Sequence, residues 1–247
     1  MDIIEGRNPV IEALRAGRPI SKILLDRNIQ IRGAVDQILH LSRLKGVQVE
    51  YVDRQTLDQQ GVTSSSQGVI ALAAARAYVD LDYLFNVSDE KQEPPLYVLL
   101  DGLEDPHNLG AILRTAEATG VHGVVIRERR AVGLTPAAVK ASAGAAEYIP
   151  LAMVTNISQA ILVLKKKSIW VIGIDMDGEL GYDKVDFNLP TAIVIGGEGK
   201  GLSDLARKRC DAVASIPMKG KIASLNASVA AAVVMYEALR QRNKQRD

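Results

Sequence analysis

Three short apolar runs in this chain each end in a polar segment, and this pattern restricts the possible folds more than any other feature. An apolar run that ends in glycine, asparagine or serine is typical of a buried parallel strand that turns into a loop and a helix. In an open α/β sheet, ligands bind where several such strand ends meet. The pattern therefore predicts an α/β fold with one ligand site. The runs and the segments that follow them are 99–101 with 105–114, 193–195 with 196–201, and 216–218 with 224–226.

The composition fits a protein with a full hydrophobic core and no overall basic field. The 247 residues are 47% hydrophobic, and 30 Lys and Arg residues against 29 Asp and Glu residues leave a net charge of +1. Any contact with nucleic acid must therefore come from local basic patches. Aromatic residues make up only 4% of the chain, which disfavours a platform on which bases stack. We expect recognition through the main chain and polar side chains.

The chain has a single cysteine, Cys210. One cysteine cannot form an intramolecular disulfide or a cysteine-based zinc site, so we expect a reducing, cytoplasmic setting and no metal. Cys210 lies at the end of a predicted helix and is interpreted as a packed thiol. Methylation at carbon five of a pyrimidine usually proceeds through a cysteine adduct, so this context argues against that chemistry. Residues 1–7 lack the apolar region typical of a signal peptide, and no apolar run is long enough to span a membrane, so we expect no membrane partner.

Residues 1–76 are interpreted as a small α/β domain. Their apolar positions recur at helical spacing or alternate as in strands. We predict that Asn8 caps the first helix, with Pro9 in its first turn. The predicted elements are helices from Asn8, over 34–44 and from Leu57, and strands over 23–25, 47–52 and 68–72.

Residues 77–95 are predicted as a linker, because acidic residues accumulate there and Pro94-Pro95 stiffens the exit. In the second domain, 96–247, apolar runs alternate with helical stretches, which indicates a mostly parallel, buried sheet. The predicted strands include 98–100, 124–126, 170–174 and 192–195, and the predicted helices are 109–119, Thr135 to Gly144, and 226–242.

Asn108 and Arg114 are the residues of the first polar segment that indicate chemistry. Asn108 sits where a strand-to-helix turn ends, so it either caps the helix or faces a ligand. The apolar face of this helix includes Leu109 and Ile112, which puts Arg114 on the accessible side. There Arg114 either pairs with Glu117 or holds a phosphate or a developing oxyanion near the helix start.

The segment Gly196–Gly201 contains the spacing G-x-G-x-G, which is a weak match to a dinucleotide-binding fingerprint. Such a fingerprint follows the first strand of a βαβ unit, whereas this segment lies near the carboxyl end of its domain. One alternative is a sharp turn between a strand and a helix. Four glycines exceed what one turn requires, and they let main-chain groups approach an adenine or a ribose closely.

Two further sets of polar residues have both a structural and a functional interpretation. Ser224 or Asn226 can simply cap the last helix, or both can face the same site as the glycine segment. Lys140, Ser142 and Glu147 form either a solvated surface or an RNA contact.

Together these residues resemble the SpoU, or TrmH-like, branch of the SPOUT RNA 2'-O-ribose methyltransferases, in the order of the family's three motifs. Residues 100–116 resemble motif 1, Gly196–Gly201 resembles motif 2, and 216–218 with 224–226 resembles motif 3. Residues 5–14 are similar to the substrate-binding extension of the RlmB-type members, a small ribosomal-protein-like α/β domain. Ser66 departs from the pattern, because members of this branch commonly have histidine there.

The resemblance implies a trefoil-knotted catalytic domain, a homodimer, and transfer of a methyl group from S-adenosylmethionine to a ribose 2'-hydroxyl. We expect the substrate to be ribosomal RNA, with a guanosine of the large-subunit (23S) RNA as target. One alternative is the same chemistry on tRNA. Another is a non-enzymatic RNA-binding or ribosome-assembly factor that keeps the fold.

The resemblance also assigns roles to individual residues. A guanidinium is a poor base, so we expect Arg114, supplied by the partner subunit, to hold the RNA phosphate and stabilise the alkoxide. The expected catalytic residues are Asn108, Arg114, Glu198, Ser224 and Asn226. The expected cofactor-binding residues are Ile195, Gly196, Gly197, Glu198, Gly199, Gly201, Ile216, Met218, Ser224, Leu225 and Asn226. The expected RNA-binding residues are Arg7, Asn8, Lys140 and Ser142.

Overall fold

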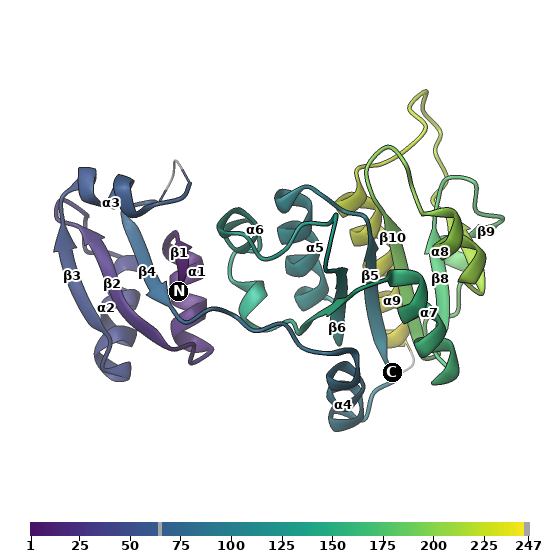
Figure 1. The fold of residues 1–247 in the computed structure, drawn as a ribbon, viewed down its shortest axis with the longest axis horizontal. Coiled ribbons are helices and arrows are strands. Elements are labelled where there is room, and N and C mark those ends of the chain that lie inside the picture. The colour runs from purple at the N-terminus through teal and green to yellow at the C-terminus, as the bar shows by residue number, and fades with distance from the viewer. Residues whose placement is uncertain (64–65, 245–247) are drawn as a thin grey trace. The chain divides into compact units, whose positions relative to one another are not determined.

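The computed structural model describes residues 1–63 and 66–244 (Figure 1). The chain divides into two compact units. Unit 1 combines Met1–Ala77 with Leu134–Tyr148, and unit 2 combines Tyr78–Gly133 with Ile149–Asp247. The predicted fold class is confirmed, because each unit is built on a β-sheet with helices packed against it.

Unit 1 is a four-stranded sheet with strand order β1-β4-β2-β3. Strand β4 pairs antiparallel with both β1 and β2, whereas β2 and β3 are parallel. Apolar residues of α1 and α2 pack against the sheet and form its larger core. The elements are β1 (Asp2–Glu5), α1 (Arg7–Arg15), β2 (Ile20–Asp26), α2 (Ala34–Lys45), β3 (Gln48–Val52), α3 (Arg54–Gln60), β4 (Val69–Ala73), α6 (Pro136–Ala141) and the 3-10 turn η1 (Ala145–Glu147).

A buried ion-pair network holds η1 within unit 1. The Glu147 carboxylate, 4% exposed, lies 2.7 Å from Nη1 of Arg18 and 3.4 Å from Nη1 of Arg76. Arg18 also pairs with Asp2. Glu147 therefore has a structural role here, and the interpretation as a solvated residue is wrong.

Unit 2 is built on a seven-stranded parallel sheet with the order β7-β6-β5-β10-β8-β11-β9. The chain runs outward from β5 to β7 and then returns to the other side of β5, so the order reverses between β5 and β10. The elements are α4 (Leu81–Lys91), β5 (Leu96–Asp101), α5 (Pro106–Ala118), β6 (Gly123–Arg127), β7 (Leu151–Val154), α7 (Ile157–Lys166), β8 (Trp170–Ile174), β9 (Leu180–Gly181), the 3-10 turn η2 (Tyr182–Lys184), β10 (Thr191–Gly196), α8 (Asp204–Arg209), β11 (Ala212–Ser215) and α9 (Ala227–Lys244).

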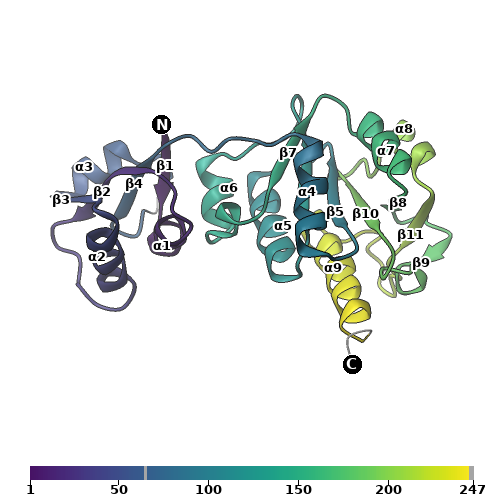
Figure 2. The ribbon, with the colours of Figure 1, turned by 90° about the horizontal axis from the view of Figure 1, so that it is seen from below.

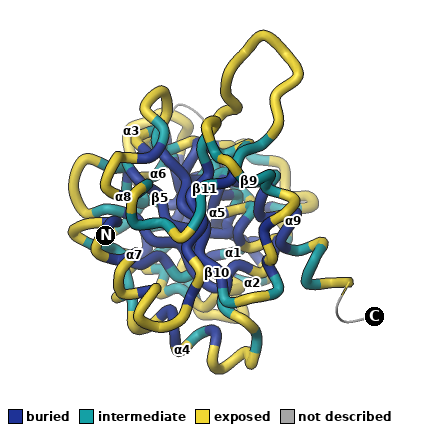
Figure 3. Tube along the Cα trace, turned by 90° about the vertical axis from the view of Figure 1, so that its right-hand side faces the viewer, coloured by how far each residue is buried: buried dark blue, intermediate teal, exposed yellow. Residues whose placement is uncertain are grey.

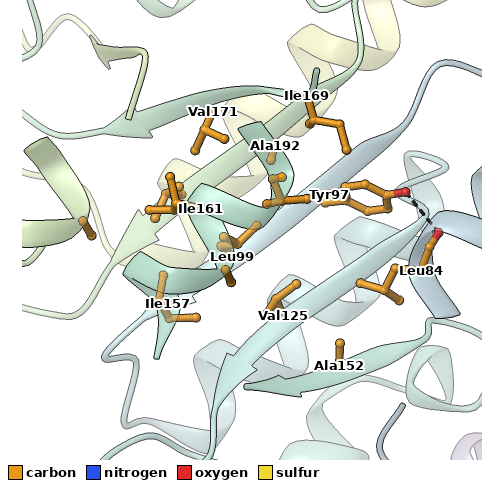
Figure 4. Close-up of a cluster of buried hydrophobic side chains, with 14 of the residues drawn as sticks. Leu84, Tyr97, Leu99, Val125, Ala152, Ile157, Ile161, Ile169, Val171 and Ala192 are labelled. Carbon is orange, nitrogen blue, oxygen red and sulfur yellow. Dashed lines mark hydrogen bonds between the residues drawn. The ribbon is translucent and has the colours of Figure 1, made fainter. Parts of the chain in front are cut away.

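Helices cover both faces of this sheet (Figure 2). Helices α4, α7 and α8 bury one face, where Tyr97 and Leu99 of β5 meet Ile161 of α7 (Figure 4). Helices α5 and α9 pack together on the other face. All six residues of β5 and of β10 are buried, as expected for strands covered on both sides. The trefoil knot that the resemblance implies stays a prediction.

The amino end of the sheet carries polar side chains that hydrogen-bond to the backbone of unit 2. His122, fully buried, accepts a hydrogen bond at Nδ1 from the Leu96 amide at 3.1 Å, and its Nε2 lies 3.4 Å from Oε2 of Glu93. Burial lowers the pKa of His122 to about 4. The Arg242 guanidinium donates to four backbone carbonyls, those of Pro94, Pro95, Phe187 and Leu189.

The structure changes two local predictions. Residues 81–91, inside the predicted linker, form α4, which is capped by Asp80 and buries Leu84 and Phe85 in unit 2. Helix α1 begins at Arg7 after Gly6, so Asn8 does not cap it. The prediction placed these boundaries by charge and polarity, whereas a few buried apolar side chains are enough to anchor an otherwise acidic helix. The domain boundaries at 1–76, 77–95 and 96–247 stay a prediction.

Candidate functional site

A cavity of about 590 Å³ lies at the carboxyl end of the unit 2 sheet. Its lining includes one residue at or next to the end of each of three strands: Ile174 of β8, Ile195 of β10 and Ile216 after β11. The segment that leads into α9, residues 223–227, lines another part of it. The cavity therefore occupies the position at which open α/β sheets bind ligands, next to the point where the strand order reverses.

The glycine segment, residues 196–202, forms one wall of the cavity. Gly197 and Gly201 face each other in an isolated antiparallel bridge, and the Gly201 amide donates to the Gly197 carbonyl at 3.1 Å. A Cβ at Gly196 would overlap the Gly201 backbone, and a Cβ at Gly197 would overlap the Gly102 carbonyl. Glycine is required here because main chains approach each other too closely for any side chain.

Asp101 fastens the end of the glycine segment to β5. Its carboxylate is buried and accepts hydrogen bonds from the Ser203 amide at 2.9 Å and from the Ser203 hydroxyl at 2.6 Å. Its carbonyl accepts from the Gly197 amide at 3.0 Å. Asp101 therefore holds both ends of the segment against one strand.

Asn108 and Glu198 lie together beside the cavity. Asp105 caps α5, since its carboxylate accepts from the His107 amide at 2.9 Å. Of the two alternatives for Asn108, the capping one is therefore wrong, because Asp105 already satisfies the first turn. The Asn108 side chain instead donates from Nδ2 to Oε1 of Glu198, in the glycine segment. This hydrogen bond connects the first and second polar segments.

The third segment is open to solvent. Residues 217–226 are all exposed, and the loop between β11 and α9 extends beyond the strand ends (Figures 1 and 3). Asn226 caps α9, because its Oδ1 accepts from the Ser228 amide at 3.0 Å. The capping interpretation of Asn226 is thus confirmed, while Ser224, Leu225 and Asn226 all line the cavity.

The structure brings together all eleven residues expected at the cofactor site, since each of them lines the cavity. Arg114 is not among the lining residues. It lies exposed on α5, beyond the turn that carries Asn108. The cavity and the expected catalytic arginine are therefore separate within one copy of the chain.

The residues expected to bind RNA lie in unit 1. Asn8 is exposed on α1, and Arg7 donates to both the side chain and the carbonyl of Gln67. Lys140 donates to Oγ1 of Thr63 at 3.0 Å. Ser142 is 1% exposed and its hydroxyl donates to the Val139 carbonyl at 2.7 Å, so it caps its own helix and presents no surface for RNA.

Sequence reasoning missed Asp175, Asp177 and Arg207, which also line the cavity. The Asp175 carboxylate lies 3.4 Å from Arg207 Nη1, and Arg207 Nη2 donates to the Asp177 carbonyl at 3.3 Å. Asp175 follows directly after the strand 170–174, so the rule that ligands bind at strand ends could have found it.

Other chemistry finds little support in the described residues. Burial raises the pKa of the Cys210 thiol to about 12, which leaves it protonated and fits a packed thiol. The described part of the chain contains no group of three or more His, Cys, Asp or Glu residues placed to bind a metal ion. No helix within residues 1–63 and 66–244 is long and apolar enough to cross a membrane.

Two family models match the chain. The model described as the SpoU rRNA Methylase family matches residues 95–236. The model described as RNA 2'-O ribose methyltransferase substrate binding matches residues 3–79.

Relatives and solved structures agree with these models. The chain is 47% identical over 242 residues to a Bacillus subtilis protein named as a TrmH family tRNA/rRNA methyltransferase, YacO, with 98% of this chain and 96% of that protein covered. The SpoU methyltransferase AviRb from Streptomyces viridochromogenes, in complex with AdoMet, matches with a TM-score of 0.82 and 29% identity over 98% of this chain and 90% of that one. An AdoMet-bound rRNA methyltransferase from Sinorhizobium meliloti matches with a TM-score of 0.77 and 25% identity, covering 97% and 87%.

Proposed function

Since this chain belongs to the SpoU family of RNA methyltransferases, which use S-adenosylmethionine, we propose that it methylates a ribose 2'-hydroxyl of a guanosine in large-subunit ribosomal RNA. The observation that carries the proposal is the cavity at the carboxyl end of the sheet, where the glycine segment and the turn 224–226 meet. The amino-terminal match to a substrate-binding model of RNA 2'-O ribose methyltransferases supports the ribose hydroxyl as acceptor.

The cavity residues fit an adenosyl cofactor. Gly196 and Gly197 form a cradle that a Cβ would fill, and the volume of about 590 Å³ lies within the range of small-molecule sites. The main chain at Gly196 and Gly197 would hold the cofactor on one side, and that at Ile216, Met218 and Leu225 on the other. When bound, the cofactor supplies the methyl group.

The remaining polar residues act on the RNA in this proposal. Asn108 and Glu198 hold each other and keep the glycine segment in place beside the reacting ribose. Ser224 and Asn226 orient the ribose from the opposite wall. Arg114 holds the neighbouring phosphate and stabilises the alkoxide as the 2'-hydroxyl loses its proton, because a fixed cation stabilises developing negative charge. Arg7, Asn8 and Lys140, on unit 1, make further contacts with the RNA.

We place Arg114 in the site of a second copy of the chain. Arg114 does not line the cavity of its own copy, and α9, which packs beside its helix, exposes Val229 and Tyr236 at 48% and 54%. Exposed apolar side chains on one helix suit an isologous interface. A homodimer through α5 and α9 would cover them and bring one copy's Arg114 to the other copy's cavity.

Mixing two inactive variants tests this arrangement. Arg114→Ala removes the cation, and Gly196→Val blocks the cavity of the other copy. Refolded together in equal amounts, they should recover about one quarter of the wild-type activity, because half of the dimers are mixed and each mixed dimer has one intact site. Failure of the mixture to exceed the single variants, or a monomer in light scattering, would contradict the shared site.

Transfer of labelled methyl groups tests the substrate. The protein is incubated with labelled S-adenosylmethionine and unmodified ribosomal RNA or tRNA, and the label is located by digestion to nucleosides. We expect 2'-O-methylguanosine from the large-subunit RNA. Label in tRNA alone would support the tRNA alternative, and label in neither RNA would support the binding-factor alternative.

A further inference from the structure

We propose that Asp175 is a positioning residue for the cofactor. Its carboxylate fixes the glycine segment and Arg207 as walls of the cavity. The inference rests on the placement of S-adenosylmethionine in this cavity, as proposed above. Asp175 is the first residue after β8, and its side chain is only 12% exposed. It belongs to none of the three polar segments from which the site was predicted.

The Asp175 carboxylate contacts three parts of the cavity wall. Its Oδ2 accepts a hydrogen bond from the Leu202 amide at 3.3 Å and lies 3.4 Å from Nη1 of Arg207 on α8. Its Oδ1 accepts from the Met176 amide at 2.7 Å. The carboxylate thus joins the end of the glycine segment to α8 and to the turn after β8.

The backbone of Asp175 is itself held in place. Its amide donates to the Ala214 carbonyl of β11 at 3.0 Å, and its carbonyl accepts from the Gly178 amide at 3.3 Å. A Cβ at Gly178 would overlap the Ala214 backbone, so this turn lies directly against β11. One aspartate therefore connects the ends of β8, β10 and β11, the three strands whose ends line the cavity.

The contact with Gly201 shows why the connection matters for the cofactor. Gly201 has a φ of 63°, and a Cβ there would lie 2.9 Å from Asp175 Oδ2. The carboxylate therefore packs against the turn of the glycine segment where the backbone reverses. Asp101 fastens the same segment from β5, on the other side of β10. With both carboxylates in place the segment is held before the cofactor arrives, which lowers the entropy lost on binding.

Calorimetric titration with S-adenosylhomocysteine, in the absence of RNA, tests the role directly. We expect Asp175→Ala to weaken binding at least about tenfold, because the segment must then be ordered by the ligand. Asp183→Ala is the control: this carboxylate makes an exposed ion pair with Lys184 and does not line the cavity, so its loss should change affinity less than about twofold. Arg207→Gln removes only the contact between the Asp175 carboxylate and α8, so it should weaken binding by an intermediate amount.

Steady-state kinetics separate positioning from a general loss of structure. For Asp175→Ala we expect the KM for S-adenosylmethionine to rise while kcat and the KM for RNA stay within about threefold of wild type. Unchanged affinity in Asp175→Ala, or equal changes in both KM values and kcat, would overturn the inference. If Asp175→Ala does not fold, the same comparison is made between Arg207→Gln and Asp183→Ala. A wild-type protein that binds no S-adenosylhomocysteine would instead contradict the cofactor site itself.

Discussion

The two ends of the unit 2 sheet use polar residues in opposite ways. At the amino end, His122 and Arg242 are occupied by hydrogen bonds to the backbone of the same unit. At the carboxyl end, Glu198, Ser224 and Asn226 are exposed around a cavity. A polar group enclosed by the backbone of its own unit stabilises the fold, whereas an exposed one at a cavity rim can also reach a ligand. The comparison predicts that changes at the amino end alter stability and that changes at the carboxyl end alter binding and catalysis.

The largest expected effect lies at the carboxyl end. Arg114→Ala should lower kcat by about 10³-fold, because the developing alkoxide loses a fixed cation. The affinity for S-adenosylhomocysteine and the melting temperature should change little, since Arg114 is exposed and does not line the cavity. Single-turnover methylation checks the rate, titration calorimetry checks the affinity, and thermal unfolding checks the melting temperature. An Arg114→Lys variant that keeps most of the activity would contradict the double role, because one ammonium lacks the several donors with which a guanidinium holds a phosphate and an alkoxide together.

At the amino end, Arg242→Met keeps the apolar stem and removes the donors to four carbonyls. The free energy of unfolding should fall by about 3 kcal/mol, because four carbonyls lose their partner and two of these hydrogen bonds are part-buried. Urea unfolding followed by fluorescence of Trp170, the only tryptophan, measures it. Arg240→Met is the control on the same helix: the Arg240 side chain is half exposed in its ion pair with Glu237, so its loss should lower the free energy of unfolding much less than Arg242→Met does. A loss of kcat at permissive temperature in Arg242→Met would break the comparison.

Gly197→Ala tests the cradle at the carboxyl end. A Cβ there would overlap the Gly102 carbonyl, so the glycine segment must shift. We expect S-adenosylhomocysteine affinity to fall about 30-fold, since displacements near 1 Å have effects of this order. Gly220→Ala, where an added Cβ meets nothing within 4 Å, is the control. Equal affinities of the two variants for S-adenosylhomocysteine would show that the close backbone approach at Gly197 does not determine cofactor affinity.

The smallest effect is a pH dependence at the amino end. The pKa of His122 is about 4 in the folded state, below its ordinary value of 6.5, so the unfolded chain binds the proton more tightly. The stability that the neutral imidazole contributes is complete above pH 6.5 and is lost as the pH falls from 6.5 towards 4. From pH 7 to 5.5 the free energy of unfolding should drop by about 1 kcal/mol more in wild type than in His122→Gln. Parallel pH profiles of the two proteins would contradict this.

Local patterns predicted the elements and most of the cavity. The strands 170–174 and 192–195 were identified by their apolar runs, and the cavity-lining residues of the glycine segment by their spacing. Two kinds of error arose. Asn108 was weighed as a cap although Asp105 was closer to the helix start, and Ser142 was assigned to RNA although it is buried. The roles of Asn108 and Ser142 both depend on their hydrogen-bond partners and neighbours in the fold. Residue type and spacing do not specify these partners.

The sequence by itself determined where strands end in polar residues, because the alternation of apolar and polar positions is a local property. Tertiary structure alone decided which of those ends meet. Asp175 lies more than twenty positions before the glycine segment, yet it contacts Leu202 because β8 and β10 are neighbours in the sheet. Strand order follows from burying both faces of the whole sheet, a requirement that no short segment carries. The site is thus assembled from residues that the sequence supplies and the sheet brings together.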